Sequence, residues 1–264
     1  MTTPERPKGS AFFLACSTFT ILPVPQHPYD PRHMASVLAY FPWMGLAGIA
    51  LAIAIIVLTE LMAAATLLRA VLVVGVLIAM TGAIHLDGFA DTVDALMSHR
   101  DRDEQLRIMR DPHIGTFAVV ALIFWALIAT AAWSSLLARS HWPTLGAALV
   151  TEIFGRSLSG LYSATLPSAH RDGMQHTQTS RQAPVVRPAL TVAYLLSSAA
   201  MIAFGHYAGI IAVVLATVTA LIFRRFSKRA FHGATGDLAG FLFTVIQAMT
   251  WLILALAGGL PKWF

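Results

Sequence analysis

Long hydrophobic runs separated by shorter polar stretches make up most of the sequence after residue 35. A helix needs roughly 20 apolar residues to cross a hydrocarbon core of about 30 Å. The runs therefore predict seven membrane-spanning helices, at Ser36–Met62, Leu68–Ile84, Thr116–Ala138, Thr144–Leu166, Ala189–Gly205, Tyr207–Phe223 and Leu238–Gly258. Residues 10–25 are apolar but short and end in Pro23 and Pro25, which predicts an interfacial or re-entrant helix. The expected fold is an all-α polytopic membrane helix bundle, with residues 1–264 as a single integral membrane domain.

Composition supports a membrane protein and excludes an ordinary soluble fold. Hydrophobic residues make up 57% of the chain and charged residues only 12%, whereas about a quarter of a soluble domain is charged. The formal net charge of +5 is compatible with nucleic-acid binding, but the basic residues lie in short loops between the apolar runs. Charge placed in this way orients a protein in the lipid bilayer. We therefore expect the bilayer, and no nucleic acid, as the partner of these charges.

The basic residues divide unequally between the two sides of the predicted bundle. Of the 18 Lys and Arg residues, fourteen fall on the side of the N-terminus and of three polar loops, around residues 85–115, 168–188 and 224–240. Three fall on the other side, and Arg156 lies within a span. Loops rich in Lys and Arg remain in the cytoplasm. The sequence predicts a multi-pass protein of the cell (inner) membrane, with its N-terminus and polar loops cytoplasmic.

Three aspartates follow directly after the second predicted span. Asp87, Asp91 and Asp94 are spaced i, i+4 and i+7, which places them on one face of a helix. Like charges so close together repel, and Mg²⁺ typically takes one or two carboxylates together with waters and a substrate phosphate. The spacing favours a magnesium site, with Gly88 allowing the substrate to come close. The alternative is a solvated helix whose carboxylates bind nothing.

Two of the polar loops carry further candidates for substrate binding or catalysis. Arg110 and Asp111 lie in the segment MRDPHIG, where a proline and a glycine mark a constrained turn before the third span. Arg171 lies in the second loop, which is basic and glycine-containing, as a loop that binds an anion is. The same loop composition is also found in loops that only orient the protein.

The third loop ends in the segment TGDLAG, directly before the last span. Thr235 and Gly236 provide hydrogen-bond donors and a flexible backbone for a substrate. Asp237 suits a second metal contact or a proton acceptor, although an aspartate at this place is also a common helix cap.

Ionisable residues also lie beside and within the spans. His85 precedes the acidic face by two residues and falls on the opposite side of the helix, so it is either a packing residue or a base. Glu152 and Arg156 are four residues apart in the fourth span, and an ion pair between them would lower the cost of burying either.

Several motifs together resemble the cobalamin synthase family, the adenosylcobinamide-GDP ribazoletransferases. The most specific is HLDGFADTVDA at residues 85–95, and others follow in the same order, namely FTILPVP at 19–25, FPWMG at 41–45, MRDPHIG at 109–115, GRSLSGLY at 155–162 and TGDLAG at 235–240. The loop near residue 172 departs from the family, because Arg171 and Asp172 stand where it tends to have paired glutamates.

The resemblance implies a magnesium-dependent phosphotransferase. Its substrates would be adenosylcobinamide-GDP and alpha-ribazole or alpha-ribazole 5'-phosphate, its products GMP and adenosylcobalamin or its 5'-phosphate. Asp87, Asp91 and Asp94 would then hold Mg²⁺ against the pyrophosphate, arginines of the loops would stabilise the departing GMP, and His85 or a carboxylate would accept the proton. Association with other late cobalamin-assembly enzymes, or into a homo-oligomer, stays open.

Two other classes of protein also place aspartates on membrane helices. The CDP-alcohol phosphotransferases do so with a longer spacer before two further aspartates, which this chain lacks, and they would release CMP from a lipid donor. A divalent-cation transporter would bind its ion near the middle of the bilayer, whereas these aspartates follow a span in a charged loop.

Overall fold

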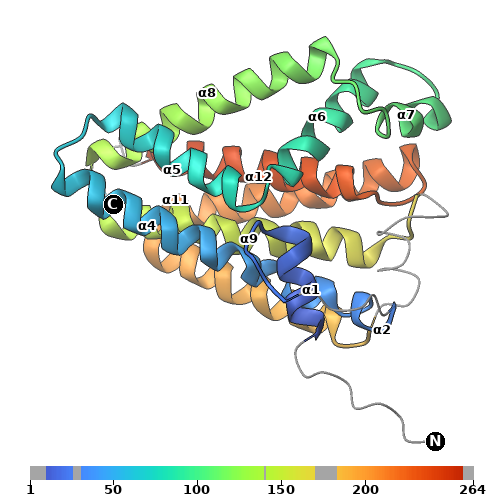
Figure 1. Cartoon of the computed structure of the whole chain (residues 1–264), viewed down its shortest axis with the longest axis horizontal. Helices are drawn as coiled ribbons and strands as arrows, with labels where there is room; N and C mark the ends of the chain where they lie inside the picture. The colour runs from blue at the N-terminus through green and yellow to red at the C-terminus, as the bar shows by residue number, and fades with distance from the viewer. Residues whose placement is uncertain (1–9, 26–30, 140, 170–182, 258–264) are drawn as a thin grey trace, which may run out of the picture.

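The computed structural model describes residues 10–25, 31–139, 141–169 and 183–257, and Figure 1 shows them as a bundle of long helices that lie side by side. Within these ranges the only β-type pairing is one isolated parallel bridge between Ser168 and Ala234. The helices are α1 (Ser10–Phe19), α2 (Pro31–Met34), α3 (Val37–Tyr40), the 3₁₀ helix η1 (Phe41–Met44), α4 (Gly45–Leu61), α5 (Thr66–Met80), α6 (Ile84–Met97), α7 (Arg102–Ile108), α8 (Thr116–Arg139), α9 (Trp142–Thr165), α11 (Val186–Ala230) and α12 (Gly236–Ala257).

Four helical segments of the described chain are long and apolar enough to cross a membrane, or five if the bent pair α5 and α6 is one span. They are Val37–Leu61, Thr116–Arg139, Val186–Ala230 and Gly236–Ala257. The predicted all-α membrane bundle is therefore confirmed.

Helix α9 coincides with the predicted fourth span but is not among these four. It lies in the middle of the bundle with most of its residues buried, so its surface meets protein and carries polar groups.

Helix α11 is two antiparallel helices joined at His206. This residue has φ 49° and ψ −131°, outside the helical region. The hydroxyls of Tyr194 and Thr217 are 2.9 Å apart, although 23 residues of straight helix would separate them by about 34 Å. At the turn a Cβ on Gly209 would lie 2.1 Å from the Met201 carbonyl oxygen, so only glycine fits there. The break predicted between Gly205 and Tyr207 is confirmed.

The three predicted polar loops meet at one end of the bundle, which we call the α7 end. There the Arg102 side chain contacts the carbonyl oxygens of Phe231 and Ala169, so parts of all three loops touch. Residues 170–182, which include Arg171, lie outside the described residues. That the α7 end faces the cytoplasm stays a prediction.

A sharp bend between α5 and α6 turns the acidic helix across the α7 end. The two helices meet at 88°, and Gly82 and Ala83 between them have left-handed φ values of 58° and 61°. The backbone N–H of Ile21, which follows α1, donates to the Met80 carbonyl at the end of α5 (3.0 Å). Helix α1 packs on the start of the first span, with the rings of Phe19 and Phe41 4.5 Å apart. The short N-terminal helix is thus confirmed, and its place at the membrane surface stays a prediction.

Candidate active site

Helices α6 and α12 cross in close backbone contact at the α7 end. A Cβ on Gly88 would lie 2.8 Å from the Asp237 Cα, and a Cβ on Gly240 would lie 3.1 Å from the His85 carbonyl oxygen. The Thr244 hydroxyl donates to that same carbonyl (3.1 Å). Small residues allow membrane helices to approach this closely. Gly88 is buried against α12, so it serves the helix crossing, and the substrate contact predicted for it has no support from this geometry.

The crossing brings Asp237 beside the acidic face of α6. Asp87 is exposed, and Asp91 and Asp237 are half-buried. The charges of Asp87, Asp237 and Asp94 all repel a negative charge on Asp91. Arg110 supplies an opposing charge, because it attracts the Asp237 carboxylate. Carboxylates of two helices thus lie close enough to repel one another, and a cation bound among them would relieve this repulsion.

The donor chemistry of this cluster suits Mg²⁺ better than a metal that needs a full protein cage. Within the described ranges, no group of three or more His, Cys, Asp or Glu side chains lies so that it could hold a metal ion by itself. Magnesium does not require such a cage, because it keeps several waters and uses one or two carboxylates with substrate phosphates. The exposed Asp87 and half-buried Asp91 provide two carboxylates with room for waters and substrate, so the residues present fit the ion.

Asp94 has a structural partner that the spacing did not indicate. Its two carboxylate oxygens accept hydrogen bonds from the backbone N–H groups of Gly115 (2.6 Å) and Ala118 (2.9 Å). These groups lie at the start of α8, so Asp94 caps that helix. A Cβ on Gly115 would come within 2.6 Å of the Asp94 carboxylate, which explains the glycine. The role of Asp94 as a magnesium ligand stays a prediction.

The Asp111 side chain makes its contacts within a local turn before α8. One of its oxygens accepts from the His113 backbone N–H (3.0 Å) and contacts the His113 ring nitrogen Nδ1 (2.6 Å). The contact with the His113 side chain, followed by its backbone hydrogen bond, lowers the pKa of Asp111. Asp111 is therefore an ionised, exposed turn residue, and its predicted catalytic role has no support from these contacts.

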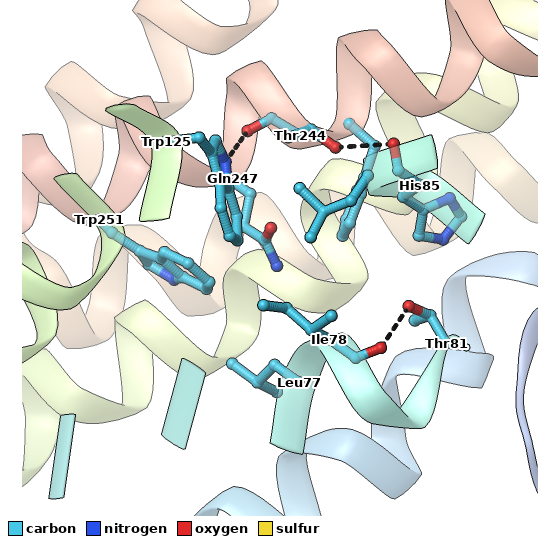
Figure 2. Close-up of a pocket in the computed structure, with 10 residues that line it drawn as sticks. Leu77, Ile78, Thr81, His85, Trp125, Thr244, Gln247 and Trp251 are labelled. Carbon is cyan, nitrogen blue, oxygen red and sulfur yellow. Dashed lines mark hydrogen bonds between the residues drawn. The ribbon is translucent and has the colours of Figure 1, made fainter. Parts of the chain in front are cut away.

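His85 lies on the opposite face of α6 from the carboxylates. Its ring is buried between Phe41 (5.6 Å between centroids) and Phe243 (4.6 Å). Figure 2 shows His85 in the wall of a small pocket between α5, α6, α8 and α12, together with Thr81 and Gln247. Because the ring faces the bundle interior, these contacts favour the packing role of His85, and its alternative role as a base beside the metal has no support from them.

The N-terminus of α12 opens toward the same site. The Thr235 hydroxyl accepts the Leu238 N–H (3.1 Å), so this buried threonine caps the helix, and its predicted contact with substrate has no support from this geometry. Gly236 is exposed, and a Cβ there would meet no atom within 4 Å. The first N–H groups of a helix attract anions, so the open space at Gly236 can admit a phosphate.

Three arginines that the sequence did not single out donate to backbone carbonyls at the α7 end. Arg187 and Arg224 bind the last turn of α9, at the Ala164 carbonyl (3.0 Å) and the Thr165 carbonyl (3.4 Å). Arg102 binds the carbonyls of Phe231 and Ala169. No local signal could have identified them, because the partners lie between 23 and 129 residues away in the chain.

The predicted ion pair within the fourth span is confirmed. Nη1 of Arg156 lies 2.7 Å from the Glu152 carboxylate, and both side chains are 2% exposed. The second Glu152 oxygen accepts from the Gln247 amide, and the Arg156 guanidinium lies 4.6 Å from the centre of the Phe243 ring. The pair therefore fastens α9 to α12 inside the bundle.

Comparison with known proteins agrees with the motifs. The family model described as cobalamin-5-phosphate synthase matches residues 11–255. Curated adenosylcobinamide-GDP ribazoletransferases include one from Stutzerimonas stutzeri, 32% identical over 93% of this chain and 98% of that protein, and one from Lachnoclostridium phytofermentans, 24% identical over 95% of each. No solved structure matches the chain. Since the family model covers nearly the whole sequence, this protein belongs to the cobalamin-5-phosphate synthase family.

Proposed function

We propose that this protein joins adenosylcobinamide-GDP to alpha-ribazole or alpha-ribazole 5'-phosphate, as an adenosylcobinamide-GDP ribazoletransferase in the last assembly stage of cobalamin biosynthesis. A ribose hydroxyl oxygen of the ribazole bonds to the phosphorus that carries the cobinamide. The bond from that phosphorus to the bridging oxygen of the pyrophosphate breaks, GMP leaves with the electron pair, and the hydroxyl proton passes to a base. The names of the curated relatives and the family match support this reaction.

The observation that carries the proposal is the meeting of Asp87, Asp91 and Asp237 beside the open N-terminus of α12. Transfer of a phosphoryl group depends on positioning and on neutralising negative charge. We assign Asp87 and Asp91 as the two residues that would hold Mg²⁺, with the Asp237 carboxylate beside them as a further negative charge. When bound, the ion neutralises charge on the pyrophosphate.

The residues around the carboxylates are suited to the anionic substrate. Gly236 offers a helix N-terminus without a side chain, and Arg110 places a positive charge near Asp237. We assign both to the phosphate groups of adenosylcobinamide-GDP. The proton acceptor is then a carboxylate of the cluster, since the His85 ring faces the bundle interior. Arg171, outside the described residues, keeps its predicted role as a contact to substrate.

The location we propose is the cell inner membrane, with the α7 end in the cytoplasm. The excess of Lys and Arg on that side supports this orientation. An amphiphilic corrinoid would then approach from the cytoplasm or the membrane surface, and the nucleotide would stay in water. Partner enzymes and self-association have no support of their own in these contacts.

The test is turnover by the purified protein in lipid nanodiscs. Supplied with adenosylcobinamide-GDP and alpha-ribazole 5'-phosphate, the wild type should release GMP with added Mg²⁺ and not with EDTA. Asp91→Asn should abolish release, whereas Glu104→Gln should not, because Glu104 is paired with Arg107, three residues away on the surface of α7. Magnesium-independent release of GMP would refute the metal assignment. Uptake of labelled Mg²⁺ into proteoliposomes without any GMP would favour a transporter.

A further inference from the structure

The segment Phe231–Gly236, which we call the α12 lead-in, determines where Asp237 lies. It runs from the end of α11 to the start of α12 and pairs with the stretch that follows α9. The Ala234 N–H donates to the Pro167 carbonyl (2.8 Å), and the Ala169 N–H donates to the Ala234 carbonyl (2.8 Å). A Cβ on Gly233 would lie 2.4 Å from the Pro167 carbonyl oxygen, so the two stretches touch without side chains between them.

Two buried hydroxyl groups, one on α9 and one on α11, bind the α12 lead-in by a chain of hydrogen bonds. The Ser227 hydroxyl donates to the Gly233 carbonyl, and the Tyr162 hydroxyl lies 2.7 Å from Ser227 Oγ. Because a serine hydroxyl has one proton, Tyr162 is the donor to Ser227. Both side chains are buried, so this contact fixes the lead-in to α9 and α11 but makes no link to the acidic helix α6.

Arg102 makes the link on the other side. It is the first residue of α7, which follows α6 after a short turn. Its Nε donates to the Phe231 carbonyl (3.1 Å) and its Nη2 donates to the Ala169 carbonyl (3.3 Å). One guanidinium therefore binds both paired stretches and joins them to the chain that carries Asp87 and Asp91.

We propose that Arg102 is a positioning residue for the reaction assigned above, and this inference rests on that proposed function. It sets the distance between the α6 carboxylates and Asp237 by fixing the lead-in against α7. Arginine suits the task because its planar fork donates in two directions at once, whereas lysine offers a single charged nitrogen. A misplacement of about 1 Å at a catalytic group can lower the rate by about a hundred-fold.

A merely structural role makes a different prediction. If Arg102 only stabilised the bundle, its removal would lower the amount of folded protein and leave the turnover and magnesium requirement of each folded molecule unchanged. Positioning instead predicts folded protein with a site that binds the metal less well. Arg107 is the matched control, because it lies on the same helix, is exposed and forms its ion pair with Glu104, three residues away.

The experiment compares Arg102→Ala, Arg102→Lys and Arg107→Ala in nanodiscs, each normalised to the folded fraction. Arg102→Ala should raise the half-saturating Mg²⁺ concentration and lower kcat by about ten-fold or more. For Arg102→Lys both values should lie between those of Arg102→Ala and the wild type. For Arg107→Ala both values should stay within about two-fold of the wild type. Equal values for the alanine variants, or an unchanged Mg²⁺ requirement in Arg102→Ala, would overturn the proposal.

Hydrogen exchange provides a readout that does not depend on turnover. The backbone amides of residues 231–238 should exchange faster in Arg102→Ala than in Arg107→Ala, while those of α9 and the middle of α12 stay protected. Unchanged exchange in this segment would refute positioning by Arg102 even if the variant is inactive. A wild type that releases no GMP would refute the proposed function, and the exchange data would still decide whether Arg102 fixes the lead-in.

Discussion

Gly88 on α6 faces the backbone of Asp237 on α12, and the space between them cannot hold a methyl group. This contact joins the two acidic segments of the chain, which lie 149 positions apart in the sequence. The neighbouring contact of Gly240 with the His85 carbonyl is of the same kind. The site therefore depends on the absence of side chains at the crossing as much as on the carboxylates.

Gly88→Ala should disable the site by pushing the two helices apart. The added Cβ would meet backbone atoms of Asp237, which cannot rotate away as a flexible side chain can. We expect a loss of about 1–3 kcal/mol in stability and a fall of about ten-fold or more in GMP release. Gly75→Ala is the control, because no atom lies within 4 Å of its Cβ position and alanine favours a helix. Equal activity of the two variants would show that the crossing does not control the site.

Asp94→Ala should lower stability more than it lowers the affinity for magnesium. Loss of a helix cap costs about 0.5–2 kcal/mol, and here both carboxylate oxygens cap α8. Gly115→Ala should cause a similar loss, because its Cβ would displace the Asp94 carboxylate. Thermal unfolding and magnesium titration of GMP release measure the two effects. If Asp94→Ala unfolds like the wild type but loses its magnesium response, Asp94 is a ligand as its spacing predicts.

Removing one partner of the buried ion pair should destabilise the bundle strongly. Arg156→Met leaves the Glu152 carboxylate in the interior with only the Gln247 amide as a partner. Breaking such a pair typically costs about 3–5 kcal/mol, and we expect a large drop in the unfolding temperature. The double variant Glu152→Gln with Arg156→Met should recover part of the loss, because no charge is then left unpaired. A double variant less stable than Arg156→Met would contradict this explanation.

The sequence predicted the helices well because membrane spans are set by length and polarity alone. Each predicted span falls on helical segments, although the first covers α3, η1 and α4, and the break at His206 falls where the apolar run was divided. The 88° bend between α5 and α6 was not predicted. It depends on left-handed backbone at Gly82 and Ala83, and an alanine in that conformation has no signature in a hydropathy pattern.

The candidate site was predictable where its residues are neighbours on one helix. The spacing of Asp87 and Asp91 placed them on a common face, and the motif TGDLAG drew attention to Asp237. For His85 the sequence left packing and catalysis open, and its ring packs against Phe243. The roles of Asp94 and Arg102 were not predictable. Asp94 caps a helix more than 20 residues later, and Arg102 binds carbonyls that only the fold brings near. Their contacts are tertiary, so periodicity carries no information about them.

Asp237→Asn and Asp111→Asn should separate the two carboxylates that the sequence proposed together as catalytic. Asp237 shares the site with Asp87 and Arg110, so removing its charge should raise the half-saturating Mg²⁺ concentration and cut GMP release by about a hundred-fold. Asp111 contacts His113 in an exposed turn, and asparagine can still accept the backbone hydrogen bond. Asp111→Asn should therefore retain most of the activity at neutral pH.

The pH dependence provides a second comparison for Asp111. The contacts with His113 lower the pKa of Asp111 from an ordinary value of about 4, so the ionised turn is present at neutral pH and is lost only as the pH falls through the lowered pKa. GMP release between about pH 6 and 8 should then show the same pH profile in Asp111→Asn and in the wild type. A pH profile of Asp111→Asn that differs from that of the wild type over this range would show that Asp111 is catalytic after all. A loss of activity equal to that of Asp237→Asn would show the same.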